Sequence, residues 1–441
     1  MVHKNSKTLI VQLFVIYSIF ISKALSVPTP SKKLVETAPA QFTPNATPGG
    51  GGNKYLDSPH FRMYNYTSVT VANSTFKSLE AAYTCFVEDL GWRSTGLSYN
   101  GDSKGNLNDA GPYYKLNVYN VGGISGAAAN TGTESATGLA FLNIVTQYLN
   151  TPSIFVHEFG HALTYCEKYW IDQVRTGAWW ETIANFVADT YLTSSVCANG
   201  RAKYGQAEGD TLIDLNKVIG DSFQVMVDGT QNSGNYYQAW PFFTYLTNNP
   251  DNYAGLGWSI FPSVWTKYSR NSNETPLHVL ERLASPTRIQ TAVGRYWARM
   301  AYVDIGHKKA QALFQKNRKN FNYANLDSLG GGKYRVKAAR QPRYMGANII
   351  PLKGTGAVTA SVTAASNSPF TATLGILAAN GVVRYLDFVN GTIQASVASG
   401  EEATLVVANT PNALLLYDPF KLTADLNKGL DYRLELTGVT A

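Results

Sequence analysis

Apolar residues recur at two different spacings in the first third of the chain. Residues 60–64 and 113–120 alternate between apolar and polar side chains, which is typical of strands that bury one face. Residues 77–90 place apolar side chains three or four positions apart, which predicts a helix. Residues 139–145 are almost continuously apolar and fit a strand or a helix start, whereas the Gly-, Ser- and Thr-rich stretch 122–137 predicts a loop. This part of the chain therefore predicts an N-terminal sheet.

Helical spacing dominates the middle of the chain. Thr151 and Pro152 are favourable residues at the start of a helix, and the apolar pattern predicts that this helix runs to about Lys168. A second helix is expected from Glu181, and a later one begins near Pro286.

The pattern changes again after residue 342. Residues 348–441 show no sustained helical spacing, and Gly, Asn and Pro separate short alternating runs. These runs are 357–363, 371–377, 382–389, 392–397, 403–407, 413–417 and 432–436. Many short strands divided by turns are typical of a β-sandwich.

Residues 1–26 predict a secretory signal peptide. Basic residues precede an apolar run at 9–21, and small residues close to position 26 fit a cleavage site. The alternative is a membrane anchor, but the run is short for a spanning helix and Lys23 closes it. No membrane association is therefore expected after signal removal. Residues 27–54 are rich in Pro, Thr and Gly and predict a mobile linker or short pro-segment.

Composition fits an exported globular protein. Apolar residues make up 44% of the chain and charged residues 15%, which is a globular profile. The formal net charge is +7 over 441 residues without a Lys/Arg block, so nucleic-acid binding is not supported. Three cysteines allow at most one internal disulfide, and none has the spacing of a cysteine metal cluster. Sequons for N-glycosylation occur at Asn45, Asn65, Asn73, Asn273 and Asn390. We expect a secreted glycoprotein, extracellular or associated with a cell wall.

The helix that begins at Pro152 contains a His-Glu-x-x-His motif. His157 and His161 lie one turn apart on one face, where two imidazoles can share one Zn²⁺. Glu158 follows the first histidine, where a carboxylate can take a proton from a zinc-activated water. Histidine accounts for only 6 of 441 residues, so chance is a weak explanation of the motif. A closed structural zinc site would need a fourth protein ligand.

The third zinc ligand is expected from the second helix. A metzincin arrangement fails, because Thr164 and Glu167 stand where its glycine and third histidine would be. Glu181 lies twenty residues after His161, and a helix–loop–helix of this length can return it to the histidines. The alternative is a carboxylate that merely favours a helix start. Asn185 and Asp189 continue the same stripe, so both are expected beside the metal ligands, and Asn185 can accept a hydrogen bond from a ligand imidazole.

The spacing of these residues resembles that of the gluzincin metallopeptidases, whose pattern is HExxH followed by ExxA/S-D. The present sequence departs from it in having Asn185 where the family usually has Asp. The resemblance implies a later His or Tyr that stabilises the oxyanion, and Tyr237 or Tyr236 stands at the matching place. The whole chain is also similar to secreted fungal and bacterial proteins of uncharacterised function with a C-terminal β-domain.

Together these observations predict an α+β zincin-like catalytic domain over residues 55–342, with an N-terminal sheet and a mainly helical second half. A β-sandwich domain would follow at 343–441. The expected function is that of a secreted zinc metallopeptidase, an endopeptidase that holds one zinc ion and cleaves protein or peptide substrates. Two alternatives stay open: a glycan- or cell-surface-binding protein that retains a zinc site without peptidase activity, and a zinc hydrolase with another substrate. The β-sandwich is a candidate for glycan contact.

Overall fold

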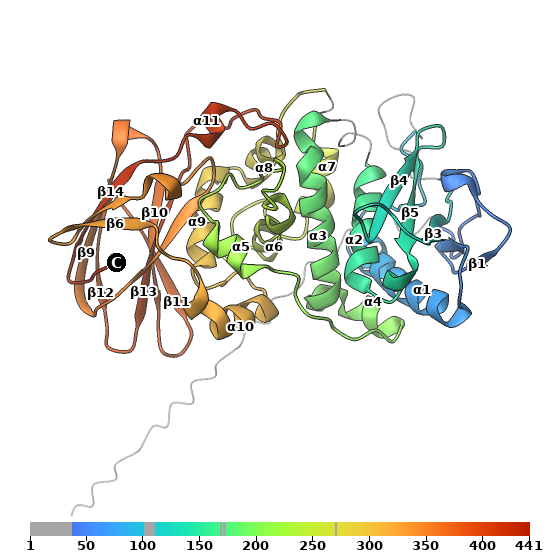
Figure 1. The fold of residues 1–441 in the computed structure, drawn as a ribbon, viewed down its shortest axis with the longest axis horizontal. Coiled ribbons are helices and arrows are strands. Elements are labelled where there is room, and N and C mark those ends of the chain that lie inside the picture. Colours follow the sequence, from blue (N-terminus) through green and yellow to red (C-terminus); the bar gives the residue numbers. More distant parts are fainter. Residues whose placement is uncertain (1–37, 101–110, 168–169, 171–172, 270) are drawn as a thin grey trace, which may run out of the picture.

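The computed structural model describes residues 38–100, 111–167, 170, 173–269 and 271–441. Along its longest axis the molecule has an N-terminal sheet, a helical middle and two C-terminal antiparallel sheets (Figure 1). The signal peptide expected at residues 1–26 lies outside the described residues. Within them, no helix combines the length and the apolar character needed to cross a membrane.

The N-terminal sheet has five strands in the order β1-β2-β3-β5-β4. They are β1 (Tyr55–Asp57), β2 (Phe61–Tyr64), β3 (Leu116–Val121), β4 (Ala129–Glu134) and β5 (Leu139–Val145). β2, β3 and β5 are parallel, whereas β1 and β4 pair antiparallel with their neighbours. The prediction of a loop over residues 122–137 was wrong, because this stretch contains β4. Only Ala129 of β4 is buried, so its sequence lacks the apolar alternation that predicts a strand.

The first helix begins earlier than its apolar pattern predicted. α1 (Val69–Tyr83) starts after Ser68, whose side chain accepts a hydrogen bond from the amide of Val71. A π-helical segment at Thr84–Asp89 follows, so the predicted helix at 77–90 is the second half of a longer helical unit. A disulfide joins Cys85 to Cys197.

Residues 38–54 correct the expectation of a mobile linker. Phe42 is only 3% exposed, and its ring packs edge-on against that of His60. The carbonyl of Pro48 accepts hydrogen bonds from Asn117 and Tyr119 of β3. This part of the Pro- and Gly-rich segment therefore packs against the N-terminal sheet through isolated apolar residues that show no periodic pattern.

Two helices form the centre of the molecule. α2 (Pro152–Tyr165) lies between the N-terminal sheet and α3 (Gly177–Thr193) (Figure 1). α2 and α3 approach closely, since a Cβ added to Gly160 would lie 2.8 Å from the Cα of Ala184. The other helices are α4 (Ala198–Lys203), α5 (Leu215–Gly220), α6 (Pro241–Asn248), α7 (Ile260–Thr266), α8 (Pro276–Ala284), α9 (Ile289–Met300), α10 (Lys308–Asn317) and α11 (Ala424–Asn427).

Two antiparallel sheets follow, in the orders β11-β10-β13-β8 and β12-β9-β14-β7-β6. Their inner faces share one apolar core, which is the arrangement of a β-sandwich. The strands are β6 (Leu326–Gly330), β7 (Lys333–Val336), β8 (Ala347–Leu352), β9 (Gly356–Ala364), β10 (Thr371–Leu377), β11 (Val383–Asp387), β12 (Thr392–Val397), β13 (Glu402–Ala408) and β14 (Tyr432–Thr437). Six of the seven predicted strands are present, and the run at 413–417 is not a strand. β6 and β7 precede residue 343, where the sandwich was expected to begin.

The sheet that contains β10 also packs on the helical region. The indole N–H of Trp297, in α9, donates to the carbonyl of Met345 over 2.8 Å. The Tyr302 hydroxyl, just after α9, donates to the carbonyl of Glu402 over 3.0 Å. Apolar residues of β8 and β13 belong to the same core as the central helices. The C-terminal sheets are therefore joined to the rest of the protein by a buried contact.

Candidate metal centre

α2 and α3 bring the three predicted ligands together. His157 and His161 project from α2 on one face, and Glu181 projects toward them from the second turn of α3. One ligand atom from each side chain lies within 4.8 Å of the others. The absence of a side chain at Gly160 permits the close helix contact that this convergence needs.

The spacing of the ligand atoms fits a tetrahedral metal ion. The two Nε2 atoms are 3.0 Å apart, and Glu181 Oε2 lies 3.1 Å from that of His157 and 3.3 Å from that of His161. Zinc bonds of about 2.0–2.1 Å place two tetrahedral ligands roughly 3.3 Å apart. Two imidazoles and one carboxylate also form a donor set that zinc prefers, and they leave one position for water. Within the described residues, no other group of His, Cys, Asp and Glu side chains meets the same criterion.

The protonation of the ligands reflects their mutual contact. Burial raises the pKa of Glu181, but hydrogen bonds to His157 and His161 outweigh it and hold the pKa far below its usual range. Burial lowers the pKa of His157, and the hydrogen bond and charge of Glu181 more than offset it, so the pKa is raised. The carboxylate thus stays ionised, as a metal ligand must be.

Asn185 lies one turn beyond Glu181 and contacts the first histidine, as predicted from its spacing. Its side-chain oxygen lies 2.8 Å from Nδ1 of His157. A proton on Nδ1 leaves the Nε2 lone pair directed at the other two ligands. The amide oxygen of Asn185 can therefore orient His157 at the position where the gluzincin pattern has Asp.

Glu158 is buried at the same cleft, with 7% of its surface exposed. The cleft has a volume of about 540 Å³. Thr131, in β4, donates its hydroxyl proton to Glu158 Oε2 over 2.7 Å. Sequence reasoning missed Thr131, because it stands in a polar run without any informative spacing.

The structure separates the two candidate tyrosines. Tyr237 lines the cleft and is 40% exposed, whereas Tyr236 is not among the lining residues. The ring of Tyr236 instead packs against those of Tyr237 and Phe420. Burial, together with the charge of Glu181, raises the pKa of Tyr237, so its hydroxyl keeps its proton at neutral pH and can donate.

Asp189 was expected beside the metal ligands, and the structure contradicts this. Its carboxylate lies 2.5 Å from Nε2 of His307 and accepts hydrogen bonds from the Thr211 hydroxyl and the Leu212 amide. Eight residues along a helix correspond to about 12 Å, which carries Asp189 past the site although it shares the stripe of Glu181. Asp189 instead joins α3 to His307, whose Nδ1 caps α10.

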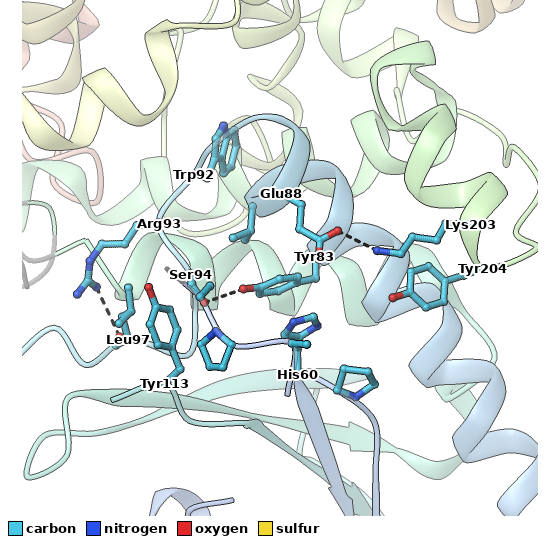
Figure 2. Close-up of a pocket in the computed structure, with 15 residues that line it drawn as sticks. His60, Tyr83, Glu88, Trp92, Arg93, Ser94, Leu97, Tyr113, Lys203 and Tyr204 are labelled. Atoms are coloured by element: carbon cyan, nitrogen blue, oxygen red, sulfur yellow. Dashed lines mark hydrogen bonds and ion pairs between the residues drawn. The ribbon is translucent and has the colours of Figure 1, made fainter. Parts of the chain in front are cut away.

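A second cavity, of about 310 Å³, lies on the N-terminal side of the molecule. Figure 2 shows the ring of Tyr83 stacked over that of His60, the Tyr83 hydroxyl near Ser94, and Lys203 paired with Glu88. None of the metal-centre residues lines this cavity. His60 is paired with the buried Glu80. This pair offers two side chains that could bind a metal ion, whereas the candidate metal centre has three.

Fold and site together define a mixed α/β protein in which two neighbouring helices present a His, His and Glu set able to hold a metal ion. Residues 53–369 match the model of a family described as "Family of unknown function (DUF6055)". Because the match covers more than half of the chain, the protein belongs to this family. No curated protein matches the sequence.

Proposed function

We propose that this protein is a zinc-dependent metallopeptidase with a zincin-like catalytic domain. The observation that carries the proposal is the convergence of His157, His161 and Glu181 at 3.0–3.3 Å, with Glu158 in the same cleft. The close pair α2 and α3 beside a sheet with an open edge strand agrees with a zincin-like fold. The resemblance to gluzincins supports the same conclusion.

The proposed reaction assigns a task to Glu158, Tyr237 and Thr131. A bound zinc ion would lower the pKa of its water ligand and polarise the scissile carbonyl. Glu158 accepts the proton of the attacking water and later delivers it to the leaving amine. The hydroxyl of Tyr237 donates to the oxygen that becomes negatively charged. The hydroxyl of Thr131 keeps the Glu158 carboxylate in place.

A peptide substrate is favoured by the position of β4. β4 is the last strand of its sheet and pairs with β5 alone among the described strands. Its residues Ala129, Asn130, Thr131 and Thr133 line the cleft of the metal centre. An extended peptide can pair with an open strand edge through main-chain hydrogen bonds. Such pairing would bring a peptide bond to the ligands without demanding a particular side chain.

We also propose that the protein is secreted and glycosylated. Asn65, Asn73, Asn273 and Asn390 are exposed, and Asn45 is half-buried. The disulfide between Cys85 and Cys197 also agrees with an oxidising compartment.

The test is cleavage of a proteome-derived peptide library by the purified full chain, with and without a chelator. We expect cleavage that the chelator abolishes and zinc restores. The Glu158→Gln variant should retain zinc and lose cleavage, because the amide cannot accept the proton. Cleavage by Glu158→Gln at the wild-type rate would exclude the mechanism. Zinc binding without any cleavage would favour the alternative of a binding protein that retains a zinc site.

A further inference from the structure

The side-chain amide of Asn185 contacts two parts of the metal centre at once. Its oxygen lies 2.8 Å from His157 Nδ1, and its nitrogen donates to the backbone carbonyl of Tyr237 over 2.7 Å. The first contact reaches a metal ligand on α2. The second reaches the short helical turn Tyr236–Gln238, which carries the tyrosine of the cleft.

These two contacts determine each other. A backbone carbonyl only accepts, so the NH₂ group of Asn185 must face Tyr237. The amide oxygen must then face His157, and Nδ1 of that ring must carry the proton. The lone pair of Nε2 is thereby left free toward His161 and Glu181. The carbonyl of Tyr237 thus selects the metal-binding tautomer of His157 through one side chain.

An Asp at position 185 would serve only one of these contacts. A carboxylate accepts the Nδ1 proton of His157 as well as an amide oxygen does. Its second oxygen, however, would lie against the carbonyl of Tyr237, where both atoms are acceptors. The backbone of the Tyr236–Gln238 turn therefore explains why position 185 holds Asn and not the Asp of the gluzincin pattern.

We propose that Asn185 is a positioning residue that couples metal binding to the placement of Tyr237. When a metal fixes the ring of His157, the amide of Asn185 is fixed as well, and the Tyr236–Gln238 turn becomes more ordered. The coupling itself needs only a bound metal; its role in turnover rests on the proposed peptidase function.

Thr182 supplies a matched control. This residue lies on the same helix and donates its hydroxyl proton to the carbonyl of Tyr236 over 2.7 Å. It therefore anchors the same turn with the same kind of bond. No hydrogen bond is found between Thr182 and His157 or His161, so its loss should loosen the turn without affecting the coupling to metal.

Hydrogen exchange of the amides of Tyr236 and Gln238, with and without zinc, tests the coupling in the full chain. In the wild-type protein we expect zinc to slow exchange by about five- to tenfold, as one additional ordered hydrogen bond would. The Asn185→Asp variant should still bind zinc, but its exchange rates at these amides should be the same with and without zinc. In the Thr182→Val variant, exchange should be faster than in the wild type both with and without zinc, and zinc should still slow it. Absence of a zinc effect in the wild type, an unchanged effect in Asn185→Asp, or failure of Asn185→Asp to bind zinc would each overturn the proposal.

Peptide cleavage gives a second readout where turnover is found. Asn185→Asp should lower kcat about tenfold with little change in KM, since one hydrogen bond is lost. In a Tyr237→Phe background the same substitution should have almost no further effect, because the residue acts through the tyrosine. Equal effects in both backgrounds would contradict the role in turnover. The exchange experiment does not depend on cleavage, so failure of the coupling and failure of the peptidase function can be told apart.

Discussion

The Glu158 carboxylate shows how a single hydroxyl from the sheet can orient the base of the proposed reaction. The Thr131 hydroxyl oxygen lies 2.7 Å from Oε2 and 3.0 Å from the backbone carbonyl oxygen of Glu158, and its single proton is donated to the nearer carboxylate oxygen. The carboxylate is buried, so the local dielectric is low and the bond to a charged acceptor is strong. The remaining oxygen, Oε1, has no hydrogen-bond partner among the described residues, so in the proposed reaction it would be the oxygen that faces the attacking water.

Replacement of Thr131 by Val tests this orientation. The shape is retained while a hydrogen bond to a charged group worth about 1.5–3 kcal/mol is lost, so we expect kcat to fall by about 10- to 100-fold. Zinc content should stay unchanged. Thr131→Ser keeps the hydroxyl and should recover most of the activity in the same peptide assay. Equal kcat values for the Val variant and the wild type would show that Glu158 is oriented by other contacts.

The residues of the site differ in how far the sequence could predict them. His157, His161, Glu181 and Asn185 follow from helical spacing, and the structure brings them together. The same reasoning was wrong for Asp189, because a shared helix face does not fix the position along the axis. Spacing also left Tyr237 and Tyr236 equivalent, since only tertiary packing decides which ring enters the cleft.

At the scale of elements, the candidate metal centre depends on the distance between α2 and α3. Gly160 lies on the contact, and a Cβ there would be 2.8 Å from Ala184 Cα and 3.1 Å from Val187 Cβ. Backbone atoms cannot yield as a flexible side chain can. A larger residue at position 160 must therefore move the helices apart and separate Glu181 from the histidines.

We expect Gly160→Ala to lower the free energy of unfolding by about 1–3 kcal/mol, as overpacking does. Zinc affinity should fall as well, because the ligand spacing widens. Gly220, in α5, is the matched control, since a Cβ there meets nothing within 4 Å. Gly220→Ala should be neutral or stabilising by about 0.4–1 kcal/mol. Denaturant unfolding and zinc titration of both variants measure the difference, and equal behaviour would refute the packing argument.

Elements with strong periodicity were predicted well, and those shaped by tertiary context were not. α2, β2 and six strands of the C-terminal sheets follow from apolar spacing. β4 and β6 were missed because most of their side chains are exposed or only partly buried, and β7 because its alternation covers only four residues. The assignment of the edge strand matters most, since β4 borders the candidate cleft.

At the scale of the whole molecule, one disulfide closes a chain loop that contains the candidate metal ligands. Cys85 and Cys197 are 112 residues apart, and the loop between them contains the whole of α2 and α3. Closing so long a loop restricts the unfolded chain strongly. The bond therefore stabilises the part of the fold that holds the ligands without touching them.

Replacement of both Cys85 and Cys197 by Ala should lower the free energy of unfolding by roughly 3–5 kcal/mol. At a temperature where the variant is folded, its zinc content and its peptide cleavage should equal those of the wild type. Denaturant unfolding of the two proteins under oxidising conditions measures the stability. A difference below about 1 kcal/mol would mean that the unfolded chain gains little freedom when the bond is removed.

The zinc content of the full chain tests the assignment of the metal centre most directly. After removal of metal, incubation with zinc and dialysis, the wild-type protein should hold about one zinc ion per chain, measured by mass spectrometry of the metal. The His161→Ala variant, folded by circular dichroism, should hold less than about a tenth of an equivalent. A wild-type content below about half an equivalent, or an unchanged content in His161→Ala, would contradict the centre formed by His157, His161 and Glu181.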